Sequence, residues 1–259
     1  MLQKIFTFLR KYLPWLVLAD IIIALAVGNV APETVKALKP WKTVPLFFML
    51  YPMMINFRIE NAAKALRNPR VVLAALVINF VISPPLAALF AHWFFQGQDP
   101  YLLAGFILKV TVAGSGMVAA WTGFAKGRVE TALSIIAAGF LVIILAVPSW
   151  MVILAGAYVP VDFWLMVKQL LWVIVLPLAA GMLTRYFILK RYGEATYKKI
   201  LPALPAISSL GMYAIVFMAV GMEARVIWQQ PQIILRLIPA MLLLYPLIFL
   251  LTMVYARLA

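Results

Sequence analysis

The chain has 259 residues, of which 66% are hydrophobic and 12% are charged, and it carries a net charge of +14 without a single cysteine. With a mean hydropathy of +1.04, this composition excludes a soluble globular domain and predicts a polytopic membrane protein. The absence of cysteine also excludes disulfides, thiolate metal sites and a cysteine nucleophile.

Long apolar segments follow one another along the whole chain. A hydrocarbon core about 30 Å thick needs about 20 apolar residues per helix. We therefore expect an all-α helix bundle with eight transmembrane spans, joined by short loops. The spans are predicted at residues 12–30, 43–57, 71–95, 101–124, 130–156, 164–187, 201–222 and 233–255.

The positive charge is distributed unevenly over these spans. With the N-terminus placed in the cytoplasm, most of the 22 Lys and Arg residues fall on the cytoplasmic side. This is the positive-inside bias of membrane proteins. We therefore expect a multi-pass protein of a bacterial or archaeal cytoplasmic membrane, with both termini in the cytoplasm. The charge indicates topology, and no nucleic-acid partner is expected.

The first predicted span contains one carboxylate, Asp20. A charge at mid-membrane depth costs roughly 2.5–3.5 kcal/mol unless it is paired, solvated or protonated. One interpretation makes Asp20 a charge partner of Lys109 in a common polar cavity. The other places Asp20 at a shallow, hydrated position on the cytoplasmic side.

Two polar residues, Asn79 and Ser83, lie one turn apart in the third span and precede Pro84-Pro85. The double proline must interrupt the helical hydrogen bonds and free nearby carbonyl groups. Hydrogen bonding between helices is the usual role of such side chains. A contact between Asn79 and a transported solute is the functional alternative.

The fourth span breaks in its middle, at residues 112–117, and Lys109 lies one turn before the break. Freed backbone groups are tolerated in a membrane only inside protein or beside a wet cavity, and broken helices bind solutes in secondary transporters. Close packing of a Gly-Ser-Gly face is the structural alternative. The predicted substrate-binding residues are Lys109, Thr111, Gly114, Ser115, Gly116, Met117 and Asn79.

The sequence contains an internal repeat, in which three pairs of residues stand at one constant offset. Pro69 corresponds to Pro231, and Pro84 to Pro246; Tyr51 and Tyr213 are a further matching pair. A unit with an odd number of spans must have its copy inverted in the membrane, as in known transporters. This predicts a ten-span 5+5 architecture.

The second copy of this repeat is predicted to be incomplete. The first five-span repeat is expected over residues 1–158 and the second, with three spans, over residues 159–259. The partner of the broken fourth span would begin beyond the last residue, Ala259. We therefore expect a chain truncated at its C-terminus; the alternative is a protein that has lost these spans.

Catalytic chemistry finds no support in the sequence. His92 is the only histidine, and it lies beside Trp93 at a predicted span end. One histidine without cysteine or clustered carboxylates predicts no metal site. No nucleophile motif, P-loop or dinucleotide fingerprint is present. No enzyme activity and no cofactor are expected.

Two segments carry a family resemblance. Residues 50–54 (LYPMM) and residues 121–128 (WTGFAKGR) resemble arsenite-efflux permeases of the bile acid:sodium symporter superfamily. The resemblance covers essentially the whole chain. It implies ten spans in two inverted repeats, a panel domain and a core domain, and a substrate site where two broken helices cross.

Two positions depart from the family pattern. The resemblance implies a Pro-Cys pair at the break, as in the arsenite permeases, but this chain has Ala113 and Gly114 at the matching positions. Because neither residue has a thiol, no thiolate can bind a soft metalloid there. Lys109 replaces an apolar residue and favours an anionic solute. Coupling to sodium or protons has no support in the residues present.

The expected function is secondary-active transport of a small anionic or metalloid solute across the lipid bilayer. The alternative is a truncated or degenerate membrane scaffold that does not transport. Loss of two spans would expose one face of the bundle, so association into a homo-oligomer is a further expectation.

Overall fold

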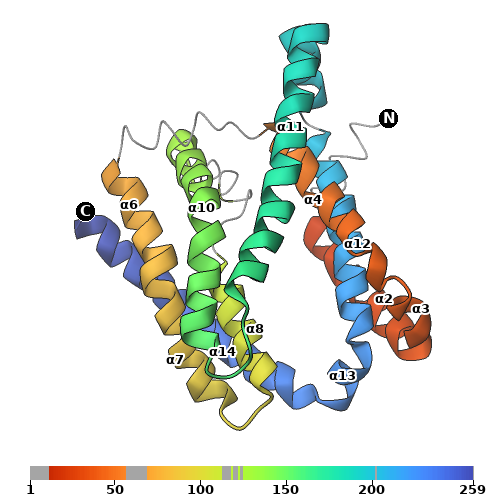
Figure 1. Cartoon of the computed structure of the whole chain (residues 1–259), viewed down its shortest axis with the longest axis vertical. Coiled ribbons are helices and arrows are strands. Elements are labelled where there is room, and N and C mark those ends of the chain that lie inside the picture. The colour runs from red at the N-terminus through yellow and green to blue at the C-terminus, as the bar shows by residue number, and fades with distance from the viewer. Residues whose placement is uncertain are drawn as a thin grey trace. The chain divides into compact units, whose positions relative to one another are not determined.

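The computed structural model describes residues 12–56, 69–112, 118, 122, 125–201 and 203–258. These residues form helices and connecting turns, and no strand occurs among them (Figure 1). The chain divides into two compact units, one of residues 1–57 and 172–231, the other of residues 58–171 and 232–259. Each unit takes segments from both predicted repeats, whose boundary at residue 158 stays a prediction.

Within the described residues, six helical segments are long and apolar enough to cross a membrane. Two shorter apolar helices, Thr43–Ile55 and Pro100–Thr111, coincide with the predicted second span and the first half of the fourth. The all-α membrane class is therefore confirmed, and the count of eight spans stays a prediction. The six are Leu13–Val30, Pro69–Phe95, Val129–Ala155, Phe163–Ile200, Leu204–Met222 and Pro231–Tyr255.

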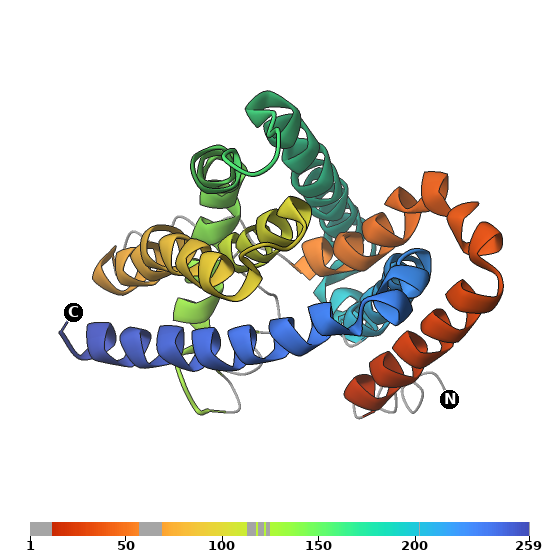
Figure 2. The same cartoon turned by 90° about the horizontal axis from the view of Figure 1, so that it is seen from below.

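Unit 1 is built around α12, which packs against both α2 and α4 and lies between them (Figure 2). The α11 segment is kinked at Gly193, whose φ of 75° and ψ of 174° are accessible essentially only to glycine. The helices that contribute to unit 1 are α2 (Leu13–Val30), α3 (Pro32–Lys36), η1 (Lys39–Trp41), α4 (Thr43–Asn56), most of α11 (Phe163–Ile200), α12 (Leu204–Met222) and α13 (Ala224–Gln229).

Glycines allow the helices of unit 1 to approach backbone to backbone. A methyl group on Gly28 of α2 would clash with the carbonyl oxygen of Gly221 on α12. A methyl group on Gly211 of α12 would clash with the backbone nitrogen of Met49 on α4. Small residues at such contacts are typical of helix packing in membranes, where close van der Waals contact replaces the hydrophobic effect.

Unit 2 contains the third, fourth and fifth predicted spans together with α14. In this unit α8 packs against α7 and the π-helical turn η3, and α10 packs against α6. The elements are α6 (Pro69–Val77), the π-helical turn η2 (Ile78–Ile82), α7 (Ser83–Phe95), α8 (Pro100–Thr111), α10 (Val129–Trp150), η3 (Met151–Ala155), the start of α11, and α14 (Pro231–Leu258).

The double proline of the third span has the effect that its chemistry predicts. Pro84 has no N–H to donate to the carbonyl oxygen of Phe80, four residues earlier. The helix widens into the π-helical turn η2 at this place, and the indole Nε1 of Trp150 on α10 donates a hydrogen bond to the freed Phe80 oxygen. Ser83 Oγ donates to the Ile78 oxygen at 2.8 Å. Both bonds use side chains to satisfy backbone groups.

Replacing Trp150 with phenylalanine is expected to lower the free energy of unfolding by about 1–3 kcal/mol, because the Phe80 carbonyl oxygen then loses its donor. The matched control is Trp164→Phe, since the Trp164 side chain is 75% exposed. Reversible unfolding of the purified protein in SDS–detergent mixtures measures both variants. Equal stabilities of the two variants would contradict this account of Trp150.

Candidate functional site

The first half of the fourth predicted span is a helix that ends at the start of the predicted break. Helix α8 ends at Thr111, and Val112 has non-helical backbone angles of φ −74° and ψ 87°. The predicted site residues Gly114, Ser115, Gly116 and Met117 lie outside the described residues. Beyond them, Thr122 Oγ1 donates to the Val118 oxygen at 2.8 Å, the spacing of a helical turn.

Lys109 lies in the last turn of α8 and is fixed by two residues of α14. Its Nζ donates to the hydroxyl of Tyr245 at 2.8 Å and to Met241 Sδ at 3.4 Å. The ammonium group also lies 4.7 Å from the centroid of the Tyr245 ring, within range of a cation–π interaction. The hydroxyl and the ring of Tyr245 and the thioether of Met241 therefore orient the ammonium group, and none of these three groups is negatively charged.

The ammonium group of Lys109 retains capacity for a further ligand. It has three N–H donors, and two of them point at Tyr245 and Met241. Within the described part of unit 2, no carboxylate pairs with Lys109. A positive charge beside a break in a helix is a natural contact for an anion, because Coulomb attraction is stronger at reduced dielectric.

Two other predicted contacts belong to the same unit. Thr111 is fully buried, and its Oγ1 donates to the Ile107 oxygen at 2.8 Å. Its proton is thus used within α8, and only its oxygen lone pairs remain for a solute. Asn79 is half-buried in the turn η2. Solute contacts by either residue stay predictions.

Asp20 lies on α2 in unit 1, whereas Lys109 lies in unit 2. The predicted pairing of these two residues therefore stays a prediction. The Asp20 side chain is half-buried, and its Oδ2 atom is buried without a hydrogen-bond partner.

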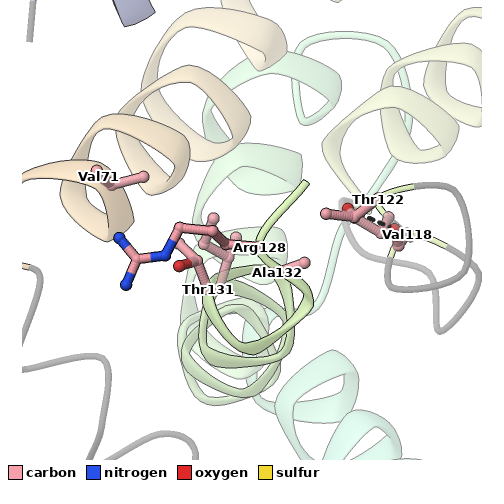
Figure 3. A pocket seen from close by; sticks show the side chains of 7 residues that line it. Val71, Val118, Thr122, Arg128, Thr131 and Ala132 are labelled. Carbon is pink, nitrogen blue, oxygen red and sulfur yellow. Dashed lines mark hydrogen bonds between the residues drawn. The ribbon is translucent and has the colours of Figure 1, made fainter. Parts of the chain in front are cut away.

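A cavity of about 420 Å³ opens at the other end of the broken span. This volume lies in the range of small-molecule sites. Figure 3 shows the Arg128 side chain extending beside Thr131 toward Val71 of α6. A guanidinium among hydroxyl groups suits an anion. The lining residues are Val71, Val118, Thr122, Arg128, Thr131, Ala132 and Ile135.

Sequence reasoning missed three residues of this region. It assigned Arg128 to topology alone, although residues 121–128 carry the family resemblance. It also missed Met241 and Tyr245 as partners of Lys109. The internal repeat contained that signal, because its offset maps the polar pair Asn79 and Ser83 onto Met241 and Tyr245.

The described residues define a polytopic helical membrane protein with a candidate anion site. They include six long apolar helices, a helix that ends at the predicted break of the fourth span, and a lysine in its last turn that pairs with no described carboxylate. The Sodium Bile acid symporter family matches residues 43–230, which is most of the chain, and the chain belongs to this family. The family resemblance predicted from residues 50–54 and 121–128 is therefore confirmed.

Three relatives illustrate the breadth of the family. The uncharacterized transporter slr0944 of Synechocystis is 30% identical over 73% of this chain and 56% of its own length. The arsenical-resistance protein Acr3 of Alkaliphilus metalliredigens is 26% identical over 86% of this chain and 68% of its own length. The probable sodium/metabolite cotransporter BASS5 of Arabidopsis thaliana is 28% identical over 78% of this chain and 48% of its own length. The chain thus spans about half to two thirds of the length of these relatives.

Proposed function

We propose that this protein is a secondary-active transporter that moves a small anionic solute across the bacterial or archaeal cytoplasmic membrane. The observation that carries the proposal is the ammonium group of Lys109. It lies one turn before the predicted break in the fourth span, is oriented by Tyr245 and Met241, and pairs with no carboxylate among the described residues of its unit. A carrier needs such a charge to be available in one part of its cycle and covered in another.

Repeated helix breaks support the inverted-repeat architecture of this proposal. Pro69 and Pro231, which define the offset of the repeat, open α6 and α14. The backbone also leaves helical geometry at Ala31 after α2 and again at Gly193, two positions that stand at the same offset. The same offset thus relates two helix starts, at the prolines, and two positions where a helix ends or kinks. Two copies of one five-span unit explain this agreement better than a chance alignment of prolines does.

The same offset supports the location of the solute site. Lys109 contacts Met241 and Tyr245 on α14, and these residues correspond to Asn79 and Ser83 in the first repeat. In inverted-repeat transporters the solute lies at the interface of the repeats, near the helix breaks. Equivalent positions beside the break are thus candidate contacts in both halves of the protein.

The cavity at Arg128 supports a cytoplasmic route to this site. The predicted topology places Arg128 in the short cytoplasmic turn between the fourth and fifth spans. A guanidinium in the lining of this cavity raises the local concentration of anions. Thr122, on the described part of the span beyond the break, lines the same cavity.

The chemistry of the break favours an anion over a trivalent metalloid. Acr3 relatives are named for arsenical resistance and BASS relatives for sodium/metabolite cotransport. Soft metalloids prefer thiolate ligands, and the chain contains no cysteine. Lys109 instead offers a hard positive charge, which suits carboxylates and oxyanions.

Flux into proteoliposomes containing the full-length protein tests the proposal. The panel is a small monocarboxylate, a dicarboxylate, sulfate, arsenite and antimonite, each measured with and without sodium and proton gradients. We expect saturable uptake of at least one anion above that of empty liposomes. Uptake of none of the five solutes under any gradient would overturn the proposal and favour the scaffold alternative.

A further inference from the structure

Helices α2 and α12 of unit 1 pack in a parallel register. A methyl group on Gly28 would meet Gly221 and Ala224, and one on Gly221 would lie 3.3 Å from the Ala24 oxygen. Ala24 of α2 thus lies beside Gly221 of α12, and Gly28 lies beside Gly221 and Ala224. Residue numbers increase in the same direction on both helices, so the helices are parallel. This register fixes which residues of the two helices lie at equal depth.

The register brings Asp20 and Tyr213 to the same level. Asp20 lies eight residues before Gly28, and Tyr213 lies eight residues before Gly221, which is about 12 Å along each helix. The two residues therefore lie at matching depth on two helices that pack against each other. Both residues are near the middle of their helices, Leu13–Val30 and Leu204–Met222.

Both side chains have a buried polar atom without a partner. Asp20 Oδ2 and the Tyr213 hydroxyl are inaccessible to solvent, and neither has a hydrogen bond. A buried polar group without a partner costs free energy, and a buried charge costs more. A hydrogen bond between the two groups would satisfy both buried atoms.

The repeat-equivalent tyrosine is different. Tyr51 corresponds to Tyr213, and its hydroxyl is hydrogen-bonded to Thr184 Oγ1 at 2.7 Å. A threonine hydroxyl does not titrate. Of these two repeat-equivalent tyrosines, it is Tyr213 that lies at the level of a carboxyl group, which can take up or release a proton.

We propose that Asp20 and Tyr213 form a proton-binding site in unit 1. In the acid form, the carboxyl O–H of Asp20 donates to the Tyr213 oxygen. When the proton leaves to water, the Tyr213 O–H donates to the carboxylate instead. The hydroxyl can reverse its role because it both donates and accepts.

A proton fits this site better than a metal cation. Hard cations take about six or more oxygen ligands, and the pair supplies only the Asp20 carboxylate and the Tyr213 hydroxyl. Ser208 and Ser209 lie about one turn before Tyr213 on α12; Ser208 Oγ is buried without a partner, and Ser209 Oγ donates to the Pro205 oxygen. Even with both of these hydroxyl oxygens, the set stays below six. The proton needs no further ligand.

Other charged groups on the elements that pack against α2 lie near its far end. Among the described residues, α3 contributes Glu33 and Lys36, which pair with each other at 3.3 Å in an exposed position. Helix α13 contributes Arg225, which is exposed and follows the residue that contacts Gly28; Glu223, also exposed, precedes that residue at the junction of α12 and α13. Tyr213 is the only titratable residue within α12. The site is therefore set apart from these charges by about two helical turns.

Infrared spectroscopy of the full-length protein in liposomes tests the site without a transported solute. Spectra are recorded from about pH 5 to about pH 9 in choline chloride. We expect a carboxylic-acid carbonyl band that disappears as the pH rises. Asp20→Asn removes this band, and Asp20→Glu restores a titrating band. Tyr213→Phe shifts the frequency of the band, whereas the control Tyr51→Phe leaves it unchanged.

Three results would overturn the proton site: no titrating band in the unaltered protein, a band that survives in Asp20→Asn, or equal spectra for Tyr213→Phe and the unaltered protein. A titration that changes when sodium replaces choline would assign the site to a metal cation and also overturn it. If Asp20→Asn does not fold, the Tyr213→Phe and Tyr51→Phe spectra decide. Because the infrared test needs no solute, it can contradict the proton site without contradicting the proposed transport. In the same way, the flux assay can contradict transport without contradicting the proton site.

Discussion

Replacement of Lys109 by glutamine is expected to reduce anion flux by about 10- to 100-fold. The variant keeps hydrogen-bonding capacity toward Tyr245 but loses the charge. Two charges about 4 Å apart interact by roughly 4 kcal/mol at an effective dielectric constant of 20, and each 1.4 kcal/mol is a factor of ten in affinity. The full ~4 kcal/mol would correspond to about a thousandfold, and hydration of the variant recovers part of it, which leaves the expected loss of about 10- to 100-fold.

Tyr245→Phe provides the graded companion to this variant. It removes the hydrogen bond at 2.8 Å and retains the ring beneath the ammonium group. We expect a smaller loss, about fivefold, because the charge remains but is less well oriented. Initial rates of anion uptake into proteoliposomes, at matched protein content, measure each variant.

Lys168→Gln is the matched control for Lys109→Gln. Lys168 is an exposed lysine of α11 in the same unit, and its charge has no place in the proposed site. Its removal is expected to leave the flux within about twofold of the unaltered protein. Unaltered flux in Lys109→Gln, or equal losses in both lysine variants, would contradict the role of Lys109.

Gly28→Ala is expected to destabilise the protein by about 1–3 kcal/mol or more, as overpacking of a fixed contact does. The added methyl group would meet the backbone oxygen of Gly221, and backbone cannot move aside as a flexible side chain can. Helices α2 and α12 would have to separate. The Asp20–Tyr213 pair depends on the same contact, so this variant also tests the helix register.

Gly139→Ala is the control for the glycine prediction. Gly139 is buried in α10, yet a methyl group there would meet no atom within 4 Å. Since alanine favours a helix over glycine by about 1 kcal/mol, this variant is expected to be neutral or stabilising. Reversible unfolding in SDS–detergent mixtures compares the two. A Gly28→Ala variant as stable as Gly139→Ala would rule out the close contact of α2 with α12.

Most of the helices could be predicted from the apolar runs and the prolines that open them. The first span was expected at residues 12–30 and is found at Leu13–Val30. The sixth was expected to end at residue 187, but α11 continues to Ile200. Hydropathy predicts only the part of a helix that lies in the lipid, so it does not predict the polar part beyond residue 187. The polar continuation is stabilised by local pairs such as Lys198 and Glu194, 3.1 Å apart.

The candidate site could be predicted only in part. Lys109 and the break after Thr111 follow from local sequence, because a charge and a run of small residues in an apolar span are conspicuous. The partners of Lys109 do not, since Tyr245 is 136 residues away in the chain. Such a contact depends on the tertiary fold, which brings the side chains of Lys109 and Tyr245 together from α8 and α14. Only the internal repeat carries a trace of it.

Solute counterflow tests most directly whether this protein is a carrier. Proteoliposomes containing the full-length protein are loaded with the unlabelled anion that gives the highest flux in the panel, and a trace of the labelled anion is added outside, without ATP or an ion gradient. A carrier that alternates its site between the two sides transiently accumulates the label above its external concentration. We predict such an overshoot, and its loss in Lys109→Gln. Label that only equilibrates, or does not enter, would contradict secondary-active transport.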